Sequence, residues 1–103
     1  MFRALTLALT GVLAVPAFAE TKSEKADRCA AQTGIVEAAI DHRASKRSQK
    51  RATRKILKSD AIKGSKYEAN VDVLVAWVFS LPDGHLNADT VKTFEQACLD
   101  YKQ

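Results

Sequence analysis

The segment VDVLVAWVFSLP, residues 71–82, decides the fold class, because it is the most apolar stretch after residue 20 and its pattern fits two structures. As a strand it alternates through Val71, Val73, Val75, Trp77, Phe79 and Leu81. As a helix it gathers Tyr67, Val71, Leu74, Val75, Val78 and Leu81 on one face. Periodicity alone does not separate the two. We expect a helix, because no partner strand is visible elsewhere and a lone strand leaves its backbone groups unpaired.

Helices are also expected on both sides of this segment. Thr21 and Glu24 form a capping-box pattern, which predicts a first helix to about His42. Its inner face carries Ala26, Cys29, Ala30, Thr33, Val36 and Ile40. Asn87 or Asp89 is expected to cap a last helix. Its inner face carries Val91, Phe94, Cys98 and Tyr101. The sequence therefore predicts a single all-α domain over residues 20–103, a small bundle of three to four helices.

The first nineteen residues have the pattern of a secretory signal peptide. Arg3 precedes an apolar run over residues 4–15, and Ala17-Phe18-Ala19 is a small-x-small cleavage site. A bilayer-spanning helix needs about 20 apolar residues, so an uncleaved anchor is the weaker alternative. We expect a periplasmic or secreted protein that begins at Glu20 and does not span the membrane after cleavage.

Two cysteines, Cys29 and Cys98, lie near opposite ends of the expected domain. Exported proteins retain disulfides, so the pair is predicted to join the first and last helices. Closing a loop of about 70 residues restricts the unfolded chain by roughly 4 kcal/mol in the entropic model. A reactive thiol pair is the alternative, and the long spacing disfavours it because redox pairs typically follow a C-x-x-C pattern.

The chain resembles a class of short exported proteins in three places: the early helical Cys29, LVAWVFSLP at 74–82 and FEQACL at 94–99. These resembled proteins are uncharacterised periplasmic helical proteins of Gram-negative bacteria. The resemblance implies a helical exported protein and carries no activity. More distantly, the disulfide-clamped layout is similar to periplasmic immunity proteins that neutralise cell-wall amidases. The contact residues of those proteins have no counterpart that can be placed here.

Side chains suited to catalysis are sparse. His42 and His85 have no second His or Cys at metal-ligand spacing, and no nucleophile or phosphate-loop motif occurs. We therefore expect no enzyme, cofactor or metal. Trp77 and Phe79 could form a binding hot spot. Their apolar surroundings favour the core instead.

The basic segment RASKRSQKRATRK, residues 43–55, holds seven Lys or Arg and no acid. Its cations recur at three- and four-residue steps, which predicts a helix that continues the first one or follows a bend near His42. They are Arg43, Lys46, Arg47, Lys50, Arg51, Arg54 and Lys55. The central four are Lys46, Arg47, Lys50 and Arg51, which we expect on one side of a helix across two turns. Residues 43–66 carry +9, whereas the rest of the chain after residue 19 carries −6.

Three anions could meet this charge. The first is the protein's own acids, or those of a second copy in a homodimer. The second is an anionic protein or envelope surface, including lipid and lipopolysaccharide phosphates. Nucleic acid is disfavoured by export and by the lack of a stacking aromatic residue. The sequence thus predicts a non-enzymatic periplasmic or secreted protein that binds an anionic partner through these basic residues. Alternatives are an immunity or inhibitor protein against an envelope-targeting effector, and an acid-stress chaperone exposing its apolar helix at low pH.

Overall fold

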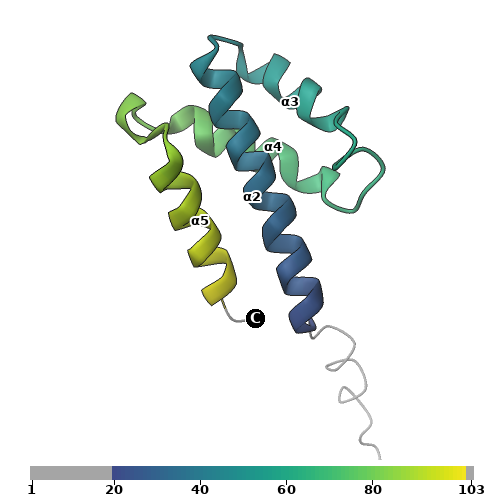
Figure 1. The fold of residues 1–103 in the computed structure, drawn as a ribbon. Helices are drawn as coiled ribbons and strands as arrows, with labels where there is room; N and C mark the ends of the chain where they lie inside the picture. Colours follow the sequence, from purple (N-terminus) through teal and green to yellow (C-terminus); the bar gives the residue numbers. More distant parts are fainter. Residues whose placement is uncertain (1–19, 102–103) are drawn as a thin grey trace, which may run out of the picture.

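A computed structural model describes residues 20–101, which form an all-α domain (Figure 1). The helices are α2 (Lys22–Ala44), α3 (Gln49–Leu57), α4 (Glu68–Ser80), the short 3-10 helix η3 (Asp83–His85) and α5 (Ala88–Asp100). No strand occurs in this part of the chain. The predicted fold class is confirmed, and residues 71–80 are helical. The expected signal peptide, residues 1–19, lies outside the described residues, as do residues 102–103.

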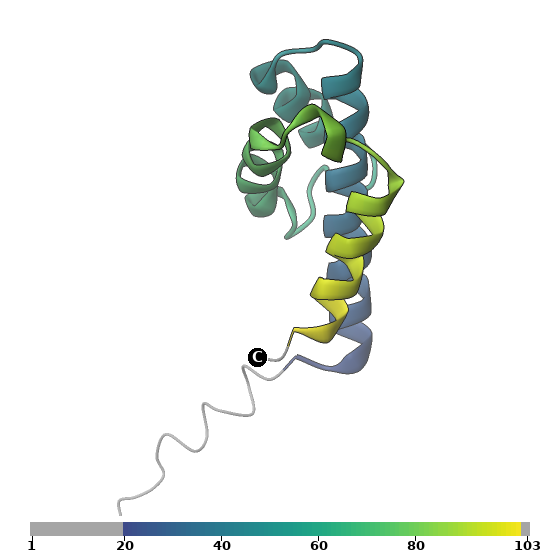
Figure 2. The ribbon, with the colours of Figure 1, turned by 90° about the vertical axis from the view of Figure 1, so that its left-hand side faces the viewer.

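The long helix α2 organises the domain, because α3, α4 and α5 all contact it. Thr21 begins α2 with the predicted capping box: its hydroxyl accepts from the Glu24 backbone N–H at 3.0 Å, and the Glu24 carboxylate accepts from the Thr21 backbone N–H at 2.9 Å. Figures 1 and 2 show α5 beside the N-terminal half of α2, whereas α3 and α4 lie near its C-terminal half. The domain therefore has a core formed by α2, α3 and α4, and an arm formed by α5 and the N-terminal half of α2.

The core lies where α2, α3 and α4 meet. Its members share near-complete burial and three- or four-residue spacing on their own helices. They are Ile35, Val36, Ala39, Ile40, Ala52, Ile56, Ile62, Val71, Val75 and Val78. The α4 members belong to the helical face expected from the sequence. Phe79 is half-buried against this core, but Trp77 is 38% exposed, so its interpretation as a core residue is wrong.

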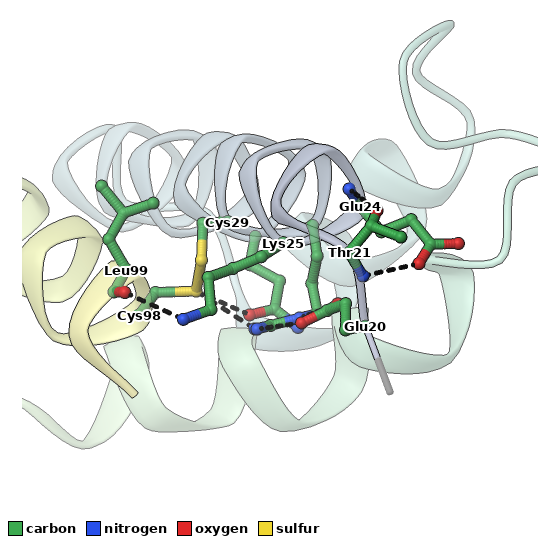
Figure 3. Close-up of polar contacts among 9 residues, drawn as sticks. Glu20, Thr21, Glu24, Lys25, Cys29, Cys98 and Leu99 are labelled. Atoms are coloured by element: carbon green, nitrogen blue, oxygen red, sulfur yellow. Dashed lines mark hydrogen bonds and ion pairs between the residues drawn. A yellow bond between two sulfur atoms is a disulfide. The ribbon is translucent and has the colours of Figure 1, made fainter. Parts of the chain in front are cut away.

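The arm is closed by the predicted disulfide between Cys29 of α2 and Cys98 of α5, with a Cα–Cα distance of 5.7 Å (Figure 3). Cys98 is the one α5 residue that is buried. Lys25 donates from Nζ to the Leu99 carbonyl at 3.2 Å, beside the disulfide. The predicted clamp between the first and last helices is confirmed.

The basic segment is not one helix. Helix α2 ends at Ala44, and Lys46 takes a left-handed conformation with φ 67°. Ser48 then caps α3, because its hydroxyl accepts from the Arg51 backbone N–H at 3.1 Å. The prediction that Lys46 and Arg47 continue the helical side of Lys50 and Arg51 is wrong. The chain turns after α2, as the bend alternative anticipated.

Arg43 is used inside the fold. Its guanidinium donates to the carbonyls of Val78, at 2.8 Å, and of Leu81. It also pairs with the Asp83 carboxylate at 2.9 Å. These carbonyls belong to the C-terminal end of α4, whose last acceptors have no partner within the helix. Arg43 therefore caps α4, and its assignment to a partner-binding surface is corrected.

We expect Arg43→Met to lower the free energy of unfolding by about 2 kcal/mol, because charged hydrogen bonds contribute roughly 1.5–3 kcal/mol. The Leu81 carbonyl loses its side-chain donor, and the Val78 carbonyl keeps only the Leu81 backbone N–H at 3.2 Å. The pair with Asp83 adds little, since that carboxylate side chain is 94% exposed. Urea denaturation followed by circular dichroism measures the change. The matched control is Arg51→Met, which removes an exposed arginine. Equal midpoints for the two variants would rule out the capping role.

Candidate functional site

Four cations gather on one side of α3 and its C-terminal cap: Arg51, Arg54, Lys55 and Lys58, here named the basic face. Steps of three, one and three residues place them on the same side of a helix. They line a hollow of about 330 Å³, and all four are exposed. The hollow thus presents guanidinium and ammonium donors to solvent.

The basic face has no acid partner within residues 20–101. The ion pairs found there join Arg28 to Glu20 and Arg43 to Asp83. Asp72 lines a neighbouring hollow of about 490 Å³ with Lys50 and Arg54, but it forms no ion pair with them. Like charges at these spacings destabilise a helix by roughly 0.2–0.5 kcal/mol per pair, and no ion pair within residues 20–101 offsets this. An external anion can offset it.

The structure divides the seven predicted binding residues into separate groups. Arg51, Arg54 and Lys55 meet in the basic face, and exposed Lys50 lies beside them. Lys46 stands in the turn, whereas Arg47 is half-buried with a nitrogen 3.3 Å from His42 Nδ1. The sequence prediction omitted Lys58 from the site. Its position seven residues after Arg51 was the available signal, since seven residues complete about two helical turns.

His42 lies beside these cations at the C-terminal end of α2. Burial lowers the pKa of its imidazole, and the positive charges of Arg47 and Lys55 lower this pKa further. Both causes favour the neutral ring. His42 therefore adds no positive charge to its surroundings at neutral pH.

A second, apolar hollow of about 490 Å³ lies between α4 and α5. Trp77, Leu81, Phe94 and Ala97 supply its apolar lining, and Asp89 and His85 are among its polar residues. The rings of Trp77 and Phe94 lie 5.7 Å apart between centroids. A half-exposed tryptophan beside a hollow is typical of protein-binding hot spots.

Metal-binding and membrane-spanning features are absent from the part of the chain that the structure describes. No three His, Cys, Asp or Glu side chains in residues 20–101 cluster as metal ligands would. None of the described helices combines the length and hydropathy needed to cross a bilayer. Comparison with protein families, curated proteins and solved structures finds no match for the chain. The resemblance to exported Gram-negative proteins stays a prediction.

Proposed function

We propose that this protein is a non-enzymatic periplasmic or secreted binding protein whose basic face contacts an anionic partner. The observation that carries this proposal is the lack of any carboxylate partner for Arg51, Arg54, Lys55 and Lys58 within residues 20–101. Outside residues 43–66, the chain after residue 19 carries eleven acids and only five cations. The fold nevertheless leaves these four charges facing solvent, where a partner can reach them.

An anionic envelope surface fits this arrangement better than nucleic acid does. Arginine donates in a planar fork that matches phosphate oxygens, and lysine supplies a compact charge. Each cation near an anionic membrane contributes about 1 kcal/mol of binding. The basic face carries no aromatic ring on which a base could stack. The proposed export to the envelope also places lipid phosphates within reach.

Co-sedimentation with lipid vesicles tests this function. The purified protein should bind vesicles containing phosphatidylglycerol at low salt and leave purely zwitterionic vesicles in solution. Binding should weaken strongly at high salt, because ions screen exposed charges. Absence of binding to both vesicle types at low salt would refute an envelope-lipid partner. Equal binding to both would refute a charge-driven contact.

An inhibitor or immunity protein is the second candidate, and the exposed Trp77 hollow favours it. In that case Trp77 would anchor an effector, and truncation of such an anchor typically costs at least 2 kcal/mol of binding. Co-elution with a purified cell-wall amidase, lost in Trp77→Ala, would support this function. No feature of residues 20–101 similarly favours the acid-stress chaperone.

A further inference from the structure

An apolar hollow adjoins the basic face. It has a volume of about 210 Å³ and lies where α2 meets α3 and the turn that follows α3. Ala30, Gly34 and Ala38 line it from α2, and Ile56 and Ile62 line it from the other side. Lys55 belongs to both this hollow and the basic hollow, so the two share a wall. Cationic and apolar binding surface are thereby contiguous.

We propose that the two hollows together bind one phospholipid molecule, with its phosphate on the basic face and the first part of an acyl chain in the apolar hollow. This inference rests on the proposed function and specifies its partner. Charge complementarity sets the orientation of the ligand. Lys55 is the one basic-face residue that also lines the apolar hollow, so the phosphate has to lie on the Lys55 side of that hollow. A phospholipid carries its anionic head group next to its apolar chain, and the basic hollow lies next to the apolar hollow in the same way.

The size and chemistry of the apolar hollow favour a lipid chain over a peptide. Ligand pockets typically measure roughly 300–1,000 Å³, so 210 Å³ suits part of a single chain. Each buried methylene contributes about 0.8 kcal/mol. A peptide needs polar partners for its backbone, but the Ser59 hydroxyl here already donates to the Ile56 carbonyl at 2.7 Å. The neutral form favoured for His42 leaves Lys55 as the charged residue in the hollow wall.

Gly34 allows a sharp test, because a Cβ added there meets nothing within 4 Å. Gly34→Leu adds a large apolar side chain at the wall of the apolar hollow, and leucine is a residue that helices tolerate well. Gly34→Ala is the matched control, since it adds a single carbon and leaves most of the hollow open. Circular dichroism melts establish that both variants fold. Ala30→Leu enters the same hollow from an exposed position and replaces Gly34→Leu if that variant fails to fold.

Isothermal titration with two probes measures the chain and the head group separately. The first probe is lysophosphatidylglycerol below its micelle concentration, and the second is glycerol phosphate. Wild type and Gly34→Ala should bind the lysolipid, whereas Gly34→Leu should bind it at least about 10-fold more weakly, the equivalent of about two buried methylenes. All three should bind glycerol phosphate equally and more weakly than wild type binds the lysolipid.

Equal lysolipid affinity for Gly34→Leu and Gly34→Ala would overturn the inference, as would equal wild-type affinity for the two probes. Either result, with binding to anionic vesicles retained, would leave the proposed function standing. If the wild type does not bind anionic vesicles at all, the proposed function itself is refuted. An acidic peptide that binds in place of the lysolipid, and is blocked by Gly34→Leu, would assign the hollow to a protein partner and overturn the lipid proposal.

Discussion

Replacing Cys29 and Cys98 together by serine should lower the free energy of unfolding by about 4 kcal/mol, a large share of the stability of a domain of this size. The disulfide closes a sequence separation of 69 residues, and the restricted unfolded chain accounts for this value in the entropic model. For a domain of this size the melting temperature should fall by roughly 20 °C. Thermal melts of the oxidised wild type and the double variant measure the change.

The loss should be concentrated in α5. Within that helix Cys98 is buried, whereas Val91 and Phe94 are only half-buried against the core. Native-state hydrogen exchange should therefore accelerate more along α5 than at Val71 and Val75 of α4. Full reaction of the native protein with a thiol reagent before reduction would contradict the disulfide. Uniform acceleration across α4 and α5 would contradict the arm-and-core description.

The second large effect is expected on binding. Replacing all four residues of the basic face by glutamine should weaken binding to anionic vesicles by about 1,000-fold at low salt. Each charge contributes about 1 kcal/mol, and 1.4 kcal/mol corresponds to a factor of ten. Stability should stay unchanged or rise slightly, because like-charge repulsion along α3 is removed. Vesicle co-sedimentation and a thermal melt of both proteins report the two quantities.

The opposite combination would contradict this prediction. If the basic face paired with the protein's own acids in solution, the four-glutamine variant would lose stability. Wild type and variant would then show the same weak binding at every salt concentration. The vesicle measurement at high salt serves as the control, because screening should bring both proteins to a similar low level.

The sequence predicted the helices well because their signals are local, whereas the clamp spans 69 residues and was predicted from the presence of two cysteines in an exported chain. The capping box at Thr21 involves residues three apart, and Val71, Val75 and Val78 share one side of a helix whatever they contact. Cys29 and Cys98 needed only the assumption of export. The burial of Trp77 was mispredicted because α4 is apolar on most sides. The sequence of α4 does not say which of these sides the other helices cover.

The basic segment was harder to predict, because exposed cations do not require a helical register. Their three- and four-residue spacing continued across the turn at Lys46, and Ser48 was the one local signal for a new helix. The role of Arg43 depends on carbonyls of Val78 and Leu81, which only the tertiary fold brings near it. Lys58 was left out of the predicted site for a related reason. Its position next to Arg54 and Lys55 depends on where α3 begins and ends, which the sequence did not fix.

The central claim is that position, and not net charge alone, makes the basic face a binding site. Two triple variants of identical net charge test it most directly. One replaces three basic-face residues by glutamine: Arg51, Arg54 and Lys55. The other replaces three exposed lysines outside the basic face by glutamine: Lys22, Lys66 and Lys92.

The measurement is the affinity of each triple variant for phosphatidylglycerol vesicles at low salt, relative to wild type. The basic-face variant should lose about 100-fold, because about 1 kcal/mol is removed with each of its three charges. The matched variant should lose less than about 10-fold, since its lysines lie away from the contact. Equal losses by the two variants would contradict a localised site and reduce the binding to an effect of net charge.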